Sequence, residues 1–151
     1  MSRTLVFSLR GESNEPYEDI GIIENISPFN YQEFCGNEFN LITANNVFGH
    51  TDNLDEMFSS LTAVLSKDGY FCFEVSYIYD MVTSNVFDLI YHENLSFHGI
   101  KSLIPFLAKH NLYVEDIQRI TSKGGFIRVL TSKKKNLENH EIINEFIKLE
   151  N

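Results

Sequence analysis

Two neighbouring stretches, FNLITANN at Phe39–Asn46 and NLDEMFSSLTAVLSKDGYFCFEV at Asn53–Val75, decide the fold. The runs Phe39–Ala44 and Tyr70–Val75 are apolar almost without interruption, which is typical of parallel strands that are covered on both faces. Between these runs, apolar residues recur at helical spacing over Asn53–Ser66. The order strand, helix, strand predicts part of an α/β sheet.

The predicted helix carries signals at both of its ends. Asn53 can cap its start, with Glu56 three residues further along the chain. We expect Asp68-Gly69 to stop it, because glycine suits the left-handed conformation at a helix C-terminus. The apolar positions of the helix are Leu54, Met57, Phe58, Leu61, Val64 and Leu65.

Similar elements are predicted on both sides of this unit. Towards the N-terminus, Thr4–Leu9 and Ile20–Ile26 have the composition of strands. Towards the C-terminus, a second helix is marked by Ile100, Leu103, Ile104 and Leu107. This helix should end near His110-Asn111, and Pro105 inside it predicts a kink or a later start.

The C-terminal third is predicted to contain the strands Leu112–Ile120 and Phe126–Thr131. The link Lys123-Gly124-Gly125 between them is short, which favours an antiparallel hairpin. Leu137–Leu149 is predicted to be an amphipathic helix with one apolar face, formed by Ile142, Ile143, Phe146 and Leu149. Together these elements predict a protein of the α/β class, a three-layer αβα sandwich that ends in an antiparallel strand pair.

The composition excludes several classes of protein. The 151 residues suffice for one domain with a core, and 43% hydrophobic with 22% charged residues is ordinary for a globular protein. No apolar run approaches the ~20 residues of a membrane span, and Met1–Arg10 does not resemble a signal peptide. The isolated Cys35 and Cys72 indicate reduced thiols, so we expect a cytoplasmic protein. The net charge of −9 argues against nucleic acid as a partner.

The segment Tyr91–His98 has a high density of groups that handle protons. It combines a tyrosine hydroxyl, two imidazoles, a carboxylate and a carboxamide, which are groups that general acid–base catalysis requires near one reacting centre. It follows the strand Tyr70–Val75, just as Asn45-Asn46 follows the preceding strand. Because ligands bind outside the carboxyl ends of strands in α/β sheets, we expect these segments to converge there with Glu74–Tyr79.

Simpler interpretations exist for several of these residues. The Tyr91 loop could be a solvated polar loop, and His50, which follows a glycine, could be a surface or capping residue. Glu74 could be buried, in which case it would need a partner, because an unpaired buried charge is costly. His92 and His98, with Glu93 nearby, could suggest a metal site, but Ser96 stands where the second histidine of a helical His-Glu-x-x-His motif belongs. We therefore expect no metal.

Five motifs in this order resemble a known enzyme family. Phe39–His50, a helix ending in Lys67-Asp68-Gly69, and Phe73-Glu74-Val75 resemble the second half of a class I S-adenosylmethionine-dependent methyltransferase. Ile90–Phe97 and Gly124–Val129 are similar to the C-methyltransferases that act on nucleotide-linked deoxysugars. The resemblance implies an incomplete Rossmann-like methyltransferase core.

The resemblance also implies roles for particular residues. The segment after the Asn-Asn strand lines the S-adenosylmethionine pocket of the family, which implies cofactor binding by Ala44, Asn45, Asn46 and His50. The Tyr-His-Glu-His run of the family lies at the sugar, which implies catalytic roles for Tyr91, His92, Glu93, Asn94 and His98. Asn94 stands at the position of the family's second histidine, the expected base, and a carboxamide can hydrogen-bond but cannot take up that proton.

The resemblance divides the single domain, 1–151, into a divergent segment at 1–19, a family-like core at 20–132 and a C-terminal helix at 133–151. Three parts of the family have no counterpart here: a cysteine-rich zinc module, a glycine-rich loop after the first strand and a C-terminal domain. Arg10-Gly11-Glu12-Ser13 holds only one glycine where the loop would approach the cofactor. We therefore expect weak or no methyl transfer by this chain alone.

Three functions stay open at this stage. The first is an S-adenosylmethionine-dependent methyltransferase acting on a nucleotide sugar or a similar small molecule. The second is a non-catalytic remnant of the fold that serves as a binding or assembly module, and the third is half of a split enzyme completed by another chain. Because a sheet that lacks strands leaves an unpaired edge, we expect a homo-oligomer or a partner chain that supplies the missing parts.

Overall fold

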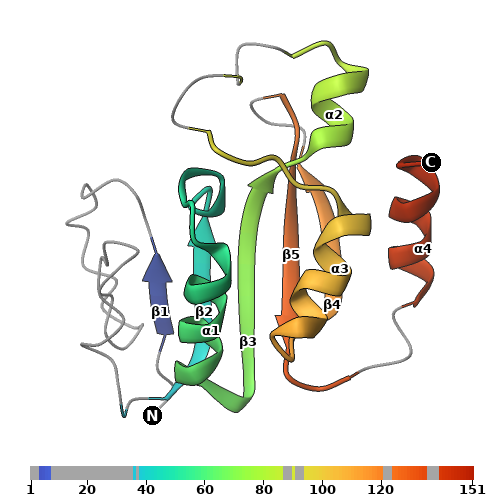
Figure 1. The fold of residues 1–151 in the computed structure, drawn as a ribbon. Helices are drawn as coiled ribbons and strands as arrows, with labels where there is room; N and C mark the ends of the chain where they lie inside the picture. The colour runs from blue at the N-terminus through green and yellow to red at the C-terminus, as the bar shows by residue number, and fades with distance from the viewer. Residues whose placement is uncertain are drawn as a thin grey trace.

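A computed structural model shows one five-stranded sheet with helices packed against it (Figure 1). The structure describes residues 4–7, 36, 38–86, 90, 94–120, 124–135 and 140–151. The strands lie in the order β1-β2-β3-β5-β4, and their bounds are β1 Thr4–Phe7, β2 Phe39–Asn45, β3 Leu65–Ser76, β4 Tyr113–Ile120 and β5 Phe126–Ser132. The helices are η2 Phe48–His50, α1 Leu54–Val64, α2 Ile78–Thr83, α3 Ile100–Lys109 and α4 His140–Leu149.

The sheet has a parallel part and an antiparallel part. Strands β1, β2 and β3 run parallel, whereas β5 runs antiparallel to both of its neighbours, β3 and β4. The run Tyr70–Val75 lies within β3, the central strand. These findings confirm the predicted α/β class and the antiparallel C-terminal pair. The predicted strand Ile20–Ile26 lies outside the described residues.

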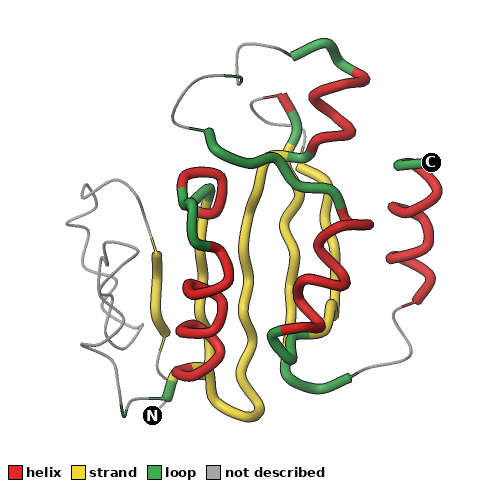
Figure 2. The backbone as a smooth tube through the Cα atoms, in the orientation of Figure 1, coloured by secondary structure: helices red, strands yellow, loops and turns green. Residues whose placement is uncertain are grey.

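The core lies between the sheet and the helices α1 and α3, which run in front of the strands in Figure 2. Phe71 and Phe73 of β3 point towards these helices and are almost completely buried. They meet Phe58 of α1 and Phe48 of η2, whose ring centroids are 4.7 Å apart. Tilted and edge-to-face contacts of this kind are the favoured arrangements of aromatic rings.

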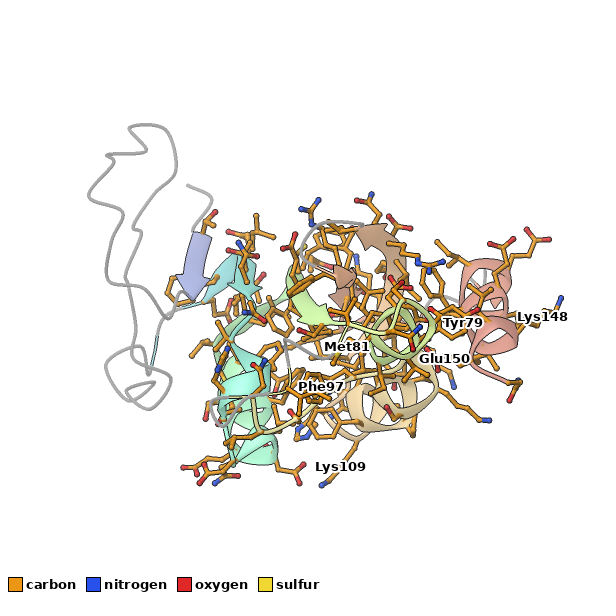
Figure 3. The ribbon with its side chains drawn as sticks, turned by 90° about the horizontal axis from the view of Figure 1, so that it is seen from above. Tyr79, Met81, Phe97, Lys109, Lys148 and Glu150 are labelled. Atoms are coloured by element: carbon orange, nitrogen blue, oxygen red, sulfur yellow. The ribbon has the colours of Figure 1, made fainter. Side chains whose placement is uncertain are left out.

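The opposite face of the sheet is more open. Figure 3 shows α1 and α3 on one side of the strands and α4 beyond their edge. On the other side, Tyr70 of β3 is 47% exposed, and Cys72 and Glu74 are half-buried. The strands were predicted to be covered on both faces. In the part of the chain that the structure describes, helices cover one face, so the sheet and one helical layer of the expected three layers are present.

The start of α1 is as predicted, but its end is not. Asn53 caps the helix by accepting a hydrogen bond from the backbone N–H of Glu56 at 3.3 Å. The helix ends at Val64, and the chain becomes extended at once at Leu65. Gly69, predicted as a left-handed helix stop, lies instead inside β3, where a Cβ would come within 2.9 Å of the Phe39 carbonyl oxygen. The glycine permits close approach to β2, and its φ is not positive.

Helix α3 begins at Ile100, so the later start that Pro105 suggested is wrong. The proline lies inside the helix, which ends with His110 at the C-cap, as predicted. Asn111 follows with a positive φ of 55°, a conformation that asparagine tolerates better than most residues.

The remaining elements complete the edge of the sheet. Gly124 and Gly125 both have positive φ and connect β4 to β5, which confirms the predicted hairpin. Helix α4 packs against α3 and β4, with Phe146 buried in the core. Leu149, predicted to share that apolar face, is 42% exposed. None of the described helices is long and apolar enough to cross a membrane.

Candidate active site at the carboxyl ends of the strands

The predicted site segments meet at the carboxyl ends of β2 and β3. Residues Asn94–His98, here called the crossing segment, pass above the end of β3 before the chain enters α3 (Figure 1). The remaining residues of the predicted catalytic group, Tyr91, His92 and Glu93, lie outside the described residues. The predicted convergence is therefore confirmed for the described part of these segments.

Hydrogen bonds to backbone carbonyl oxygens hold the crossing segment against η2. The N–H of Leu95 donates to the carbonyl oxygen of Gly49 at 2.6 Å, and Ser96 donates its hydroxyl to that of Phe48 at 3.3 Å. The side-chain oxygen of Asn94 lies close to Gly49, at 3.4 Å from the position that a Cβ would take there. Asn94 is thus placed directly over the turn that follows β2.

The other end of the crossing segment is bonded to β3 and α2. The N–H of His98 donates to the carbonyl oxygen of Ser76 at 3.3 Å, and the N–H of Ile78 donates to that of His98 at 3.0 Å. His98 and Tyr77 form a parallel bridge. The crossing segment therefore continues the backbone hydrogen bonding of the sheet beyond Ser76, the last residue of β3.

The asparagine pair after β2 forms a second wall of the site. Asn46 has a φ of 52°, and its N–H donates to the carbonyl oxygen of Glu74 at 2.9 Å. This left-handed residue turns the chain from β2 into η2, at whose end the half-buried His50 lies. Asn45 is exposed at the end of β2, whereas the side chain of Ala44 is completely buried in the core. Of the predicted cofactor residues, Ala44 could therefore face a ligand only through its backbone.

Glu74 has an ion-pair partner, as we expected for a carboxylate at this position. The Nε of Arg128 on β5 donates to its carboxylate at 2.8 Å, and the two residues are paired in register across the sheet. Asn45 lies opposite Glu74 on the other side. Glu74 is therefore half of an ion pair on the open face of the sheet, next to the asparagine wall.

His98 is the described histidine with the environment most relevant to proton transfer. Its side chain is buried, and Ser96 Oγ lies 3.1 Å from its Nε2. Burial lowers the pKa of the imidazole below its usual range, because charge is costly away from water. The ring is therefore neutral near pH 7 and holds an unprotonated nitrogen.

One arrangement near the site was not predicted from the sequence. Asp80 of α2 is buried and accepts a hydrogen bond from Arg119 Nε of β4 at 3.0 Å, and the guanidinium lies 5.6 Å from the ring centre of Tyr79. A Cβ at Gly125 would collide with Asp80. Asp80 and Arg119 are 39 positions apart in the sequence, so no local pattern connects them. The adjacent glycines Gly124 and Gly125 were the sequence signal nearest to this pair.

Comparisons with solved structures identify the fold of the chain. A putative S-adenosylmethionine-dependent methyltransferase from Listeria monocytogenes matches 89% of this chain and 81% of its own, with a TM-score of 0.62 and 9% identity. A second such enzyme, from Mesorhizobium loti, matches 86% and 80%, with a TM-score of 0.59 and 12% identity. The chain carries part of a class I methyltransferase fold.

One curated relative is similar to this chain in sequence. The C-methyltransferase NovU of Streptomyces niveus is 32% identical over 92 residues, which are 61% of this chain and 22% of that protein. The chain thus spans about a fifth of the length of this relative. Magnesium protoporphyrin IX methyltransferase from Synechocystis, solved with bound SAH, shares the fold with a TM-score of 0.54 and 10% identity, over 76% of this chain and 52% of its own. No protein-family model matches the chain.

Proposed function

We propose that the chain is part of an S-adenosylmethionine-dependent methyltransferase that methylates a carbon atom of a nucleotide-linked sugar. The observation that carries the proposal is the contact between the crossing segment and the turn after β2, because it joins the predicted acceptor loop to the predicted cofactor wall. The similarity to a C-methyltransferase over 92 residues supports the choice of carbon as the methylated atom.

The described residues fit one wall of a nucleoside-binding site. Asn45, Asn46 and His50 would hold S-adenosylmethionine, because carboxamides and an imidazole can both donate and accept hydrogen bonds. Phe7, the last residue of β1, lies in register beside Ala44, so the ends of two parallel strands meet there. S-adenosylmethionine, when bound, would supply an electrophilic methyl group.

The acceptor carbon must lose a proton to a base of this chain. A neutral imidazole is a suitable acceptor at physiological pH, and His98 is neutral because it is buried. Tyr91, His92 and Glu93 belong to the same proposed group. Asn94 would position the acceptor by hydrogen bonding, since its carboxamide cannot take up the proton.

A specific observation also favours a second candidate, a non-catalytic or split remnant that acts as a binding or assembly module. Asn94 brings a neutral carboxamide to the place where a base is expected, directly over Gly49. In the described part of the chain β1 is paired on one side only, by β2. The free backbone groups of such an edge can pair with a strand of a second copy or of a partner chain.

Calorimetric titration with S-adenosylmethionine and with S-adenosylhomocysteine separates the two candidates. Asn46→Gly keeps the left-handed backbone but removes the carboxamide, so we expect at least a roughly tenfold loss of affinity. Asn85→Gly is the matched control, because Asn85 also has a positive φ, 53°, but follows α2. Absence of binding by the wild type would favour the assembly module, whereas equal affinities of the two variants would show that Asn46 does not contact the cofactor.

Turnover tests the acceptor side of the site. With a nucleotide-linked keto sugar and methyl-labelled cofactor, Glu93→Gln should abolish methyl transfer. Asn94→His should raise it, because an imidazole would then stand at the position of the missing base. Full turnover by Glu93→Gln, with no effect of Asn94→His, would show that this loop is a solvated surface.

A further inference from the structure

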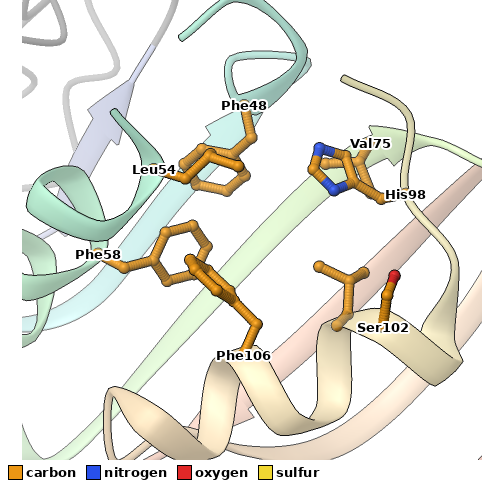
Figure 4. Close-up of a pocket in the computed structure, with 8 residues that line it drawn as sticks. Phe48, Leu54, Phe58, Val75, His98, Ser102 and Phe106 are labelled. Atoms are coloured by element: carbon orange, nitrogen blue, oxygen red, sulfur yellow. The ribbon is translucent and has the colours of Figure 1, made fainter. Parts of the chain in front are cut away.

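A cavity beneath the crossing segment has a chemical character of its own. It lies between α1, α3 and the end of β3 and has a volume of about 180 Å³ (Figure 4). Three phenylalanine rings and three aliphatic side chains line it, namely Phe48, Phe58, Phe106, Leu54, Val75 and Leu103. The only other lining residues among those described are His98 and Ser102.

The cavity has a closed floor and an open rim. Phe48, Phe58 and Val75 are each only 1% exposed and form the floor. Phe106 is half-buried and Ser102 is exposed, so the cavity reaches the surface along α3. A ligand could therefore enter between the helices without unfolding the core.

The polar groups of the lining are few and specific. The Ser102 hydroxyl donates to the carbonyl oxygen of Gly99 at 2.9 Å. His98 uses Nε2 towards Ser96, and its other ring nitrogen lies on the side of the ring nearer the cavity (Figure 4). A neutral imidazole pairs with one donor and one acceptor. The cavity thus offers one hydrogen-bonding position on an otherwise apolar wall.

We propose that this cavity binds a small aromatic molecule of one ring that carries a single hydroxyl group, with the hydroxyl directed at His98. An apolar cavity of about 150 Å³ stays dry and accepts benzene, so the space here suits a ring of that size. The faces and edges of the phenylalanine rings provide the contacts that such a ring prefers. A sugar or phosphate is excluded, because its polar groups would be left without partners.

The proposal holds whether or not the chain transfers methyl groups. The cavity lies on the helix side of the sheet, whereas Asn45 and the Glu74–Arg128 pair lie on the open face. His98 belongs to both the cavity wall and the crossing segment. An aromatic ligand would therefore contact the proposed acceptor site from below.

Methyl NMR of the full chain, labelled at leucine and valine, tests the proposal with phenol and toluene as probes and D-glucose as control. We expect saturable shifts at Leu54, Val75 and Leu103, and none at the exposed Val82. Phenol should bind roughly three- to tenfold more tightly than toluene, because only phenol can hydrogen-bond to His98. Glucose should cause no shift.

Three variants test where and how the probes bind. Leu103→Phe fills the cavity and should abolish the shifts, whereas Val82→Ala, on the exposed side of α2, should leave them unchanged. His98→Phe should remove the preference for phenol while toluene still binds. No saturable shift in the wild type, equal binding by Leu103→Phe, or shifts centred on Val82 would each overturn the proposal. Because the wild-type pattern is decisive, the test holds even if one variant fails to fold.

Discussion

Gly125 is a residue whose replacement by alanine should cost considerable stability. Its φ is +106°, and a Cβ would collide with the buried Asp80. Gly125→Ala should therefore lower the free energy of unfolding by about 3 kcal/mol or more, the sum of backbone strain and overpacking. Gly36→Ala is the matched control, because Gly36 has a φ of +92° and no described atom within 4 Å of the added Cβ. It should cost only about 1–2 kcal/mol in urea unfolding. Equal costs would contradict the contact with Asp80.

The buried imidazole of His98 makes stability depend on pH in a predictable direction. Burial lowers its pKa in the folded chain, whereas the unfolded chain titrates near pH 6.5. Between these two pKa values the unfolded state binds more protons, so stability is complete above pH 6.5 and falls as the pH decreases. Urea midpoints at pH 7.5, 6 and 5 should show this loss in the wild type and a smaller loss in His98→Gln. Identical pH profiles would mean that His98 does not titrate differently on folding.

Among the elements, α3 and α4 are joined by a carboxylate at a helix start. Glu150 accepts hydrogen bonds from the backbone N–H groups of Ile100 at 2.7 Å and Lys101 at 2.9 Å. A negative charge is favourable at a helix N-terminus, so Glu150→Ala should lower the free energy of unfolding by about 1–2 kcal/mol. The exposed Glu145 lies on α4 itself, and Glu145→Ala should have little effect. Chemical denaturation of the two variants compares them directly, and the same stability for both would disprove the capping role.

The sequence predicts elements well where the signal is local. The cap of α1 at Asn53 and the hairpin at Gly124 follow from residues within a few positions of each other. The predicted end of α1 was wrong. A glycine is needed at position 69 because a Cβ there would come too close to the Phe39 carbonyl oxygen on a neighbouring strand. A glycine that permits close approach and a glycine that stops a helix look the same in a sequence.

At the site, too, contacts between residues far apart in the sequence were harder to predict than local ones. The meeting of Asn46 and the crossing segment could be predicted, because the carboxyl ends of parallel strands share one edge. The Asp80–Arg119 pair and the Glu150 cap could not, because their partners are 39 and 50 residues apart and no periodic pattern connects them.

At the scale of the molecule, the face of the sheet that the described helices leave open is a candidate surface for a partner. Tyr70 is 47% exposed there, in register with Leu41 on β2 and Ser132 on β5. Cys72 lies two residues further along the same face, where burial raises the pKa of its thiol. Among the described strands β1 is paired only by β2, and a sheet face with an exposed aromatic residue near such an edge is more stable when another chain covers it.

We therefore expect the chain to self-associate through this face. Tyr70→Lys would place a charge in the contact and should raise the dissociation constant about tenfold or more, since aromatic residues often dominate such interfaces. Val82→Lys is the matched control, because Val82 is 66% exposed but lies on α2, at the carboxyl edge. Sedimentation velocity over a range of concentrations measures both. If the wild type stays monomeric at high concentration, the open face is not a self-association surface. If Val82→Lys dissociates the assembly as well as Tyr70→Lys does, the contact lies at the carboxyl edge instead.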